Sequence, residues 1–327
     1  MKLATITHGG ATKAALVSPD GQTFWPLEQM LGRAVSDLGA IVGGFDAIRS
    51  KIVPSGAGLP LSAVKIEAPI PRPARNVMCV GKNYHEHAKE FTRSGFDSSA
   101  SSAADAIPTA PIVFTKAPEC VIADGADIRY PEGVSDSVDY EAELGLVIGK
   151  GGRGIAKADA YAHIFGYTII NDVTARDLQG KHKQWFLGKS LDTFCPMGPW
   201  LVTADEVDPE SLTVKCWVNY ELRQNANTRD LIFDIPTLIE TISAGITLRP
   251  GDIIATGTPV GVGIGFTPPK FLKRGDRITM EVKVRSKVSL SDAVLSVLLP
   301  GGLEVENPRL KTSGADPANQ PYEQDRQ

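Results

Sequence analysis

The sequence lacks the features that mark several large classes of protein. No apolar run approaches the ~18 to 20 residues of a membrane-spanning helix, so no membrane span is expected. The N-terminal stretch MKLATITHGG alternates apolar and polar residues, which predicts a first strand and not a signal peptide. With 34 basic and 38 acidic side chains there is no positive excess that would attract nucleic acid. We therefore expect a cytoplasmic protein with a small-molecule partner and with no nucleic-acid or membrane partner.

Motifs built on cysteine, histidine or glycine are missing as well. The four cysteines, at positions 79, 120, 195 and 216, show no C-x-x-C spacing, which favours reduced thiols over disulfides or zinc ligands. The five histidines include no H-E-x-x-H pair, so a zinc hydrolase is not expected. The run GKGGRGI (Gly149–Ile155) has neither the GK[ST] of a P-loop nor a G-x-G-x-x-G turn, and we interpret it as a hairpin turn.

The most informative stretch that is present is DYEAELGLVIG, residues Asp139–Gly149. Its glycines and β-branched residues disfavour a helix, and as a strand it would place Asp139, Glu141 and Glu143 on one face. The opposite face would be apolar and would carry Tyr140, Ala142, Leu144, Leu146 and Ile148. A solvated outer face is the simpler interpretation of an isolated E-x-E.

A second strand, predicted over Phe165–Ile170, ends at Asn171-Asp172 and enters a turn or helix. It would present a third carboxylate at a strand end. Buried like charges are costly unless a cation lies between them, and oxygen ligands suit hard divalent ions such as Mg²⁺, Mn²⁺ or Ca²⁺. The three carboxylates therefore predict a metal site with positions open to a substrate.

A possible acid-base pair follows the short apolar strand Asn76–Val80. The residues after it predict a helix over Tyr84–Thr92, with Asn83 as N-cap and Glu86 completing a capping box. His87 and Glu90 would share one side of that helix, where the carboxylate could orient the imidazole as a base. The alternative is a surface ion pair.

Two further polar positions are candidates for substrate contact. Lys189 lies in LGKS beside an apolar run, where its ammonium could stabilise a developing oxyanion; the alternative is a lysine that extends from a strand edge. Thr258 lies in the glycine-rich loop Thr256–Gly263, whose N–H groups could bind a carboxylate; the alternative is a purely structural turn.

The chain is expected to have two domains and a tail. Residues 1–70 would form a small N-terminal α+β domain that includes a helical stretch over Leu27–Ile48, and the proline-rich Pro69–Arg75 would join it to a catalytic domain over 71–300. The small, polar segment 94–111 would be a lid or else a surface excursion. Residues 301–327, poor in large apolar side chains, would be a flexible tail.

Several motifs occur together and in order. They are VGKNYHEHAKE (Val80–Glu90), DYEAELGLVIG (Asp139–Gly149), NDVTARD (Asn171–Asp177), GKSLDTFCPMGPW (Gly188–Trp200), VNYELRQ (Val218–Gln224) and GDIIATGTPVGVG (Gly251–Gly263). As an ordered set over residues 74–290, they resemble the fumarylacetoacetate hydrolase family.

The resemblance implies an α+β, β-rich fold, a mixed β-sandwich roll that forms a homodimer with one Mg²⁺ or Mn²⁺ per subunit. It implies that the metal ligands are Glu141, Glu143 and Asp172. It also implies that His87 and Glu90 activate water and that Lys189 stabilises an oxyanion. Substrate contacts would come from Arg176, Gln179 and Thr258, with Tyr84 and Gly257 as further candidates.

For the reaction, the same resemblance and the intact His87–Glu90 pair favour a C–C bond hydrolase. It would cleave a 2,4-dioxo acid, such as an acylpyruvate from aromatic catabolism, to pyruvate and a carboxylic acid. The alternative within enzymes is a decarboxylase of 2-oxo acids such as oxaloacetate, or a hydratase or isomerase, on the same metal site. A protein that binds metal or sugar acids without turnover is a third interpretation.

Overall fold

The computed structural model describes residues 1–97, 99, 105–283 and 293–298. Its main element is a mixed sheet of 12 strands, most of which follow the order β4-β3-β2-β1-β13-β11-β10-β16-β6-β7, while β5 pairs with β1 and β8 pairs with β13. The strands are β1 (Lys2–His8), β2 (Ala11–Val17), β3 (Thr23–Pro26), β4 (Leu59–Pro60), β5 (Lys65–Glu67), β6 (Val77–Gly81), β7 (Ile112–Lys116), β8 (Val121–Ile122), β10 (Ala142–Ile148), β11 (Ile164–Asn171), β13 (Cys195–Thr203) and β16 (Ile253–Ala255). The expected α+β, β-rich class is confirmed.

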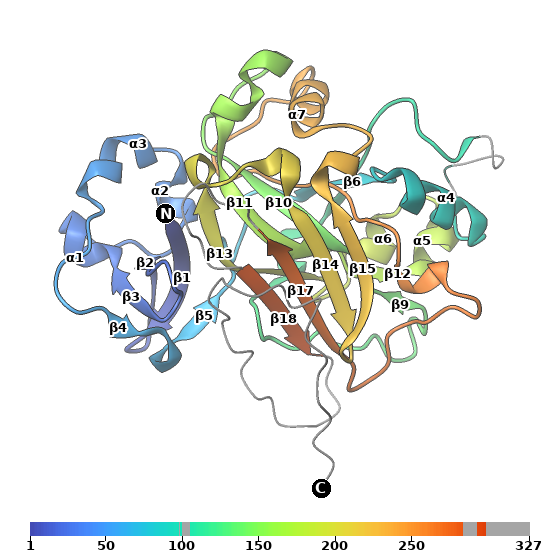
Figure 1. Ribbon diagram of the computed structural model, residues 1–327, viewed down its shortest axis with the longest axis horizontal. Helices are drawn as coiled ribbons and strands as arrows, with labels where there is room; N and C mark the ends of the chain where they lie inside the picture. Colours follow the sequence, from blue (N-terminus) through green and yellow to red (C-terminus); the bar gives the residue numbers. More distant parts are fainter. Residues whose placement is uncertain (98, 100–104, 284–292, 299–327) are drawn as a thin grey trace, which may run out of the picture.

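A second sheet of four strands packs against the first (Figure 1). It consists of β15 (Glu221–Asn227), β14 (Thr213–Val218), β17 (Arg277–Lys283) and β18 (Ala293–Leu298). Along β14 and β17 buried and half-buried residues alternate, as expected for strands with one face on a core. The run Leu212–Gln224 alternates in the sequence as in a hairpin with Asn219 and Tyr220 near its tip. The structure confirms this, because the turn between β14 and β15 is at Asn219-Tyr220, both with positive φ. A two-stranded ladder pairs β9 (Val138–Asp139) with β12 (Thr174–Ala175).

The helices are short. The α-helices are α1 (Leu27–Leu31), α2 (Gly39–Val42), α3 (Phe45–Ile48), α4 (His85–Arg93), α5 (Arg176–His182), α6 (Phe186–Lys189) and α7 (Ile235–Ser243). The 3₁₀ turns are η1 (Arg49–Lys51), η2 (Leu61–Ala63), η4 (Pro118–Cys120), η5 (Lys157–His163), η6 (Ala204–Glu206), η7 (Pro209–Ser211), η8 (Thr228–Asp230) and η9 (Gly263–Gly265). In the described part of the chain no helix is long and apolar enough to span a bilayer.

The N-terminal elements extend the large sheet, because β1 pairs with β13 as well as with β2 and β5 (Figure 1). The helical stretch expected over Leu27–Ile48 is broken into α1, α2 and α3, and Gly32 ends α1 in the left-handed conformation. A domain boundary near residue 70 and a lid over 94–111 stay predictions. Residues 98 and 100–104 of that segment, and the whole predicted tail over 301–327, lie outside the described residues.

The acidic stretch is positioned by three neighbouring strands. Its strand β10 lies between β11 and β16 and also contacts β14 of the second sheet. Every residue of β10 is buried, so neither face is solvated. The predicted single strand is also interrupted, because β9 ends at Asp139 and β10 begins at Ala142. The interruption leaves Tyr140 and Glu141 between two ladders, beside the end of β11.

Candidate active site

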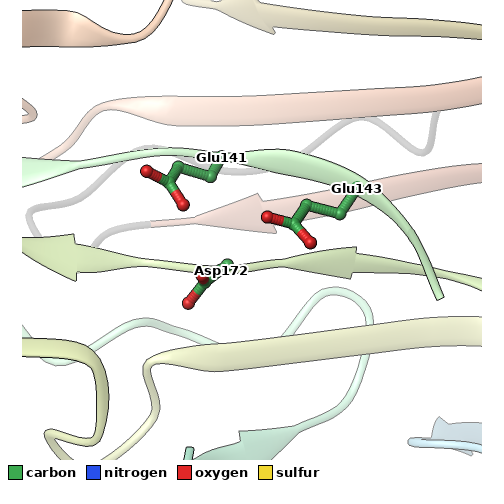
Figure 2. A group of neighbouring side chains, drawn as sticks. All are labelled: Glu141, Glu143 and Asp172. Carbon is green, nitrogen blue, oxygen red and sulfur yellow. The ribbon is translucent and has the colours of Figure 1, made fainter. Parts of the chain in front are cut away.

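Three carboxylates meet where β10 and β11 pair (Figure 2). Glu141 precedes β10, Glu143 lies on it, and Asp172 follows β11; one oxygen of each lies within 4.8 Å of the others. The backbone N–H of Asp172 donates to the carbonyl of Glu141 at 2.9 Å, which fixes the two strand ends together. The three residues are at most 4% exposed, which contradicts the simpler interpretation of a solvated acidic face.

Two buried lysines neutralise part of this charge. The Nζ of Lys189 lies 2.6 Å from Glu141 Oε2 and 2.6 Å from Asp172 Oδ2. The Nζ of Lys116, at the end of β7, lies 2.6 Å from Asp172 Oδ1 and also donates to the carbonyl of Val173. Lys189 is therefore not a lysine that extends to solvent from an edge. No sequence pattern singled out Lys116, because a lone lysine at the end of an apolar strand is common.

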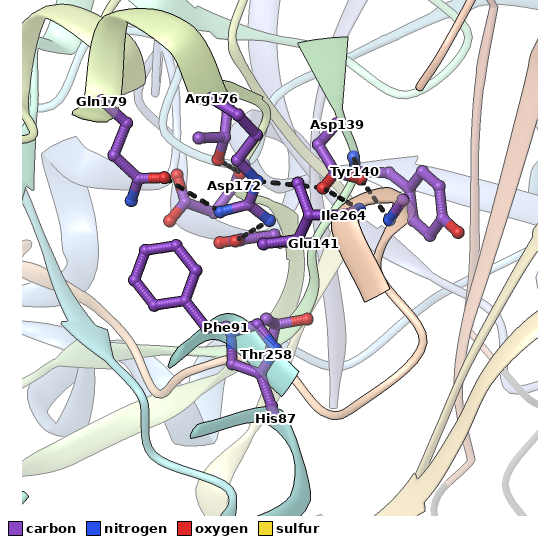
Figure 3. A network of polar contacts seen from close by, with 12 residues as sticks. His87, Phe91, Asp139, Tyr140, Glu141, Asp172, Arg176, Gln179, Thr258 and Ile264 are labelled. Carbon is purple, nitrogen blue, oxygen red and sulfur yellow. Dashed lines mark hydrogen bonds and ion pairs between the residues drawn. The ribbon is translucent and has the colours of Figure 1, made fainter. Parts of the chain in front are cut away.

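A third buried cation, Arg176 at the start of α5, connects the carboxylates to one another (Figure 3). Its Nε donates to Asp139 Oδ2 at 2.9 Å, and its Nη2 lies 2.6 Å from Glu141 Oε1. Its Nη1 donates to Gln179 Oε1 at 3.1 Å. Asp139 also accepts from the backbone N–H of Gly263 at 2.6 Å. Arg176 thus orients Glu141 and Gln179 from within a closed network.

The charges in this cluster do not balance. The cluster contains four buried carboxylates (Asp139, Glu141, Glu143 and Asp172) and three buried cations (Lys116, Arg176 and Lys189), and the cations pair with Asp139, Glu141 and Asp172. Glu143 makes no ion pair with a described residue, and its Oε2 accepts from the backbone N–H of Gly257 at 2.8 Å.

The pKa values of the two glutamates move in opposite directions as a result. Burial, together with the negative charges of Asp172 and Glu141, raises the pKa of the Glu143 carboxyl well above its usual range. Burial acts the same way on Glu141, but the ammonium of Lys189 and the guanidinium of Arg176 outweigh it and lower that pKa. A cluster of oxygen ligands with an excess negative charge fits a hard divalent cation.

His87 and Glu90 lie on α4, on the side of the helix that faces the cluster (Figure 3 shows His87). The Nδ1 of His87 is 3.2 Å from Glu90 Oε2, and both residues are buried, which excludes a surface ion pair. The backbone N–H of Gly261 donates to both oxygens of Glu90, at 3.0 and 3.2 Å. The N–H of Gly261 therefore fixes the carboxylate of Glu90, and the contact between Glu90 Oε2 and His87 Nδ1 orients the imidazole.

The helix begins differently from the prediction. Its N-cap is Tyr84, which makes no side-chain capping bond, and not Asn83. The Asn83 amide instead donates to the carbonyls of Phe233 and Thr256, and its oxygen accepts from the N–H of Phe233. Asn83 therefore joins the start of α4 to two distant loops, a use of its side chain that competes with capping.

The residues around the cluster line a partly open cavity with a volume of about 10 Å³, room for roughly one water molecule beside these side chains. Among the described residues, its lining comprises Val80, Gly81, Lys82, His87, Phe91, Phe114, Glu141, Glu143, Arg176, Gln179, Trp185, Lys189 and Thr258. Of the expected substrate contacts, Arg176, Gln179 and Thr258 line this cavity. Tyr84 and Gly257 do not, and Gly257 contacts Glu143 instead.

Glycines in the loop after β16 lie directly against the carboxylate of Glu90. A Cβ on Gly265 would lie 1.8 Å from Glu90 Oε1, so the loop can approach the carboxylate only because this residue has no side chain. Gly261 and Gly265 were not among the residues singled out in the sequence. Spacing alone assigns such glycines to a turn, and their contact with Glu90 depends on the position of α4.

We expect Gly265→Ala to impair catalysis without unfolding the protein. The new methyl group must displace the carboxylate of Glu90, the mobile end of a side chain, and His87 then loses its orientation. A misplacement of about 1 Å can lower kcat by up to ~10²-fold. Gly245→Ala is the matched control, because a Cβ there meets nothing within 4 Å. Unchanged kcat in Gly265→Ala, at unchanged Tm, would contradict the positioning role of this loop.

Comparison with known proteins gives concordant matches. A family model described as fumarylacetoacetate (FAA) hydrolase C-terminal matches residues 76–292. The chain is 56% identical to oxaloacetate tautomerase YisK of Bacillus subtilis (strain 168) over 68% of this chain and 71% of that protein. It is 45% identical to mitochondrial oxaloacetate tautomerase FAHD2B of Bos taurus, over 69% of this chain and 68% of that protein. A second family model, for the bacterial alpha-2-macroglobulin MG10 domain, matches residues 258–327, less than half of the chain.

Among solved structures, a fumarylacetoacetate hydrolase from Exiguobacterium antarcticum superposes with a TM-score of 0.75 at 35% identity. The match covers 92% of this chain and 100% of that structure.

The relatives correct one expectation. The enzyme class expected from the sequence, a hydrolase of C–C bonds, is wrong, because the curated relatives at 56% and 45% identity are tautomerases. The physical reason is that the motifs describe a site and not a reaction. A carboxylate cluster, a lysine and an oriented histidine can serve proton transfer at a carbon atom as well as activation of water.

Proposed function

Because the chain belongs to the fumarylacetoacetate hydrolase family, we propose that it is a metal-dependent tautomerase of a short 2-oxo dicarboxylic acid of the oxaloacetate class. The tautomerases among its relatives support the reaction. The observation that carries the proposal is one cavity lined by Lys189 and the oriented His87 together with the carboxylates Glu141 and Glu143. The alternative expected from the sequence, a decarboxylase, hydratase or isomerase on the same metal site, thus replaces hydrolysis, and within it we favour isomerisation.

The reaction sets a simple chemical requirement. Conversion of a 2-oxo acid to its enol removes a proton from C3 and adds one to the oxygen on C2, and no C–C bond is broken. One protein group must exchange a proton with the carbon, and another must hold or donate a proton at the oxygen. Both groups must be accessible from one bound position of the substrate.

The carboxylates of Glu141, Glu143 and Asp172 would hold the divalent cation, for which we propose Mg²⁺ or Mn²⁺. When bound, the ion supplies a Lewis acid that polarises the 2-oxo group and makes the C3 protons more acidic. Arg176 keeps Glu141 in place through its contacts with Asp139 and Gln179.

Lys189 acts at the oxygen on C2. Its ammonium is buried, touches Glu141 and Asp172, and lies 4.9 Å from the ring centroid of Phe114, so its N–H groups are held in a fixed direction. A hydrogen bond from this ammonium stabilises the negative charge that develops on the oxygen when C3 loses its proton.

His87 acts at C3. Its Nδ1 is engaged by Glu90, which leaves Nε2 as the atom that takes a proton from the carbon and returns one to it. Phe91, Phe114 and Trp185 line the same cavity and limit the entry of water. Exclusion of water protects the enol and strengthens the interactions of both groups with the substrate.

The test is a direct assay of tautomerisation. Freshly dissolved enol-oxaloacetate is added to the protein, and loss of enol absorbance and formation of the keto acid, detected with malate dehydrogenase, are followed with Mg²⁺, Mn²⁺ or EDTA. We expect the protein to accelerate conversion of enol to keto acid with metal but not with EDTA. CO₂ should not be released at a matching rate. Release of CO₂ at the rate of substrate loss would identify a decarboxylase, and no acceleration with either metal would contradict the proposal.

We further propose that the chain acts as a homodimer with one metal ion per subunit, as the family resemblance implies. Light scattering of the purified protein tests the assembly, and titration with Mn²⁺ tests the stoichiometry. A monomer or a ratio other than one ion per chain would contradict these two proposals.

A further inference from the structure

A buried ion pair outside the carboxylate cluster lies at the cavity. Lys82 directly follows β6 and lines the cavity, and its Nζ is 2.8 Å from Asp97 Oδ2, in the segment after α4. Both side chains are only 2% exposed. The hydroxyl of Thr92 lies 3.3 Å from the same Nζ and donates to Asp97 Oδ2 at 2.7 Å. The ammonium is therefore fixed between Thr92, in the last turn of the helix that carries His87, and Asp97, in the segment after that helix.

This arrangement is costly for the fold, which points to a function. Taking a lysine and an aspartate out of water costs free energy that their attraction only partly returns, and an apolar pair of similar size is often as stable. Lys82 also has a φ of 54°, a left-handed conformation that non-glycine residues seldom adopt. Strained backbone of this kind gathers at ligand sites, where it directs a side chain.

Lys82 differs from the other cations that line the cavity. Arg176 and Lys189 both contact the metal-ligand candidates, Glu141 in each case. The carboxylate partner of Lys82 is Asp97, outside the group of proposed metal ligands, so the charge of Lys82 does not neutralise those ligands. An ammonium has three N–H donors, and the described residues supply two acceptors, Asp97 and Thr92. One donor remains for a ligand.

A dicarboxylic substrate needs such a group. If its 2-oxo carboxylate end is bound at the metal, the second carboxylate must lie elsewhere in a cavity that Phe91, Phe114 and Trp185 also line. A carboxylate there without a cation would be strongly unfavourable. Trp185 packs so closely on Gly81 that a Cβ on this glycine would lie 2.3 Å from its ring, which leaves little space beside Lys82 for a bulky apolar group.

We propose that Lys82 binds the second carboxylate of the substrate and thereby sets the preference for dicarboxylic over monocarboxylic 2-oxo acids. Asp97 and Thr92 are positioning residues that hold its ammonium at the cavity wall. The inference rests on the proposed function, because it assigns the distal half of the same substrate.

The experiment compares two ligands that do not react. Malate has the carbon skeleton of oxaloacetate, and lactate lacks the second carboxylate. Calorimetry on Mn²⁺-loaded wild type, Lys82→Met, Lys82→Arg and Asp97→Asn gives the affinity for each ligand. For Lys82→Met we expect malate binding to weaken by about 10- to 100-fold with lactate binding unchanged. Lys82→Arg should restore much of the preference for malate.

Asp97→Asn distinguishes this role from a structural one, because it breaks the ion pair but keeps the ammonium. We expect malate binding to weaken, because the ammonium is held less firmly, but by less than in Lys82→Met, with lactate binding unchanged. If Asp97→Asn and Lys82→Met each weaken the binding of malate and of lactate by the same factor, the ion pair only stabilises the segment after α4. That result overturns the proposal. If Lys82→Met does not fold, Lys82→Gln replaces it, and an undiminished preference for malate in that variant overturns the proposal equally.

The outcome is separable from that of the proposed function. A wild type that prefers malate through Lys82 but does not interconvert keto and enol oxaloacetate would contradict tautomerisation and leave the carboxylate site standing. A wild type that tautomerises oxaloacetate, with a Lys82→Met variant that keeps KM and the malate preference, would contradict the carboxylate site alone.

Discussion

Replacing Glu143 by glutamine should inactivate the enzyme and at the same time make the metal-free protein more stable at neutral pH. Glutamine has nearly the shape of a protonated glutamate, and its oxygen can still accept from the N–H of Gly257. It cannot supply the anionic ligand that the metal site needs. Metal-ion catalysis contributes several kcal/mol of transition-state stabilisation, so we expect the rate of tautomerisation to fall by about 10³-fold or more.

The gain in stability follows from the pKa of Glu143. Burial and the charges of Asp172 and Glu141 raise this pKa above 4.5, so the folded protein holds the proton more tightly than the unfolded chain. The stabilising contribution is complete below pH 4.5 and is lost as the pH rises through the folded pKa. Glutamine mimics the protonated form at every pH, and each unit of pKa elevation corresponds to about 1.4 kcal/mol.

The measurement is thermal unfolding from pH 4.5 to 8 with EDTA and with Mn²⁺. Without metal, wild type should lose stability relative to Glu143→Gln as the pH rises. With Mn²⁺, wild type should gain stability and the variant should not. Glu132→Gln, at an exposed glutamate paired with Arg274, is the control and should leave both curves unchanged. If Mn²⁺ stabilises Glu143→Gln as much as wild type, Glu143 is not a metal ligand.

His87→Asn should lower kcat by about 10²- to 10⁴-fold while metal binding persists. The imidazole is the group proposed to exchange a proton with C3, and loss of a general base has an effect of this size. Asparagine keeps a polar side chain beside Glu90 but cannot take the proton. The Mn²⁺-dependent rise in Tm should stay as in wild type, because the imidazole pairs with Glu90 and is not one of the three carboxylates proposed as ligands.

His85 provides a control on the same helix, because it is exposed at the first residue of α4. His85→Asn should keep wild-type kcat and KM. A His87→Asn variant with more than a tenth of wild-type kcat would exclude the imidazole as the base. In that case Lys189 would be the next group to test, since it lines the same cavity.

The local pattern predicted much of what positions the site. Alternation of side chains along a strand placed Glu141 and Glu143 on the same side, and the end of the next strand supplied Asp172. The antiparallel register of β10 and β11, in which Ala142 pairs with Asn171, brings these residues together. Periodicity predicts a strand and its faces but not its partner, so the convergence of the three carboxylates stayed a hypothesis until the sheet order was known.

Other features were missed or misassigned for a related reason. Asn83 has the residue type of an N-cap, but three hydrogen bonds to distant loops bind its side chain and Tyr84 takes the cap position. Lys116 is 56 residues from Asp172 in the chain, and Gly261 is 171 residues from Glu90. Their residue types are compatible with several roles, and only the folded chain selects one.

The sequence by itself determined the strands, the hairpin at Asn219-Tyr220, the order of the motifs and, through them, the family. These follow from side-chain alternation, turn chemistry and residue identity, which act between neighbours in the chain. Tertiary structure alone decided which carboxylates pair with a cation, that the N–H of Gly261 binds Glu90, and that Lys82 and Asp97 are buried together. Desolvation and Coulomb energies depend on distance in space and on the exclusion of water, and neither quantity is contained in the spacing of residues along the chain.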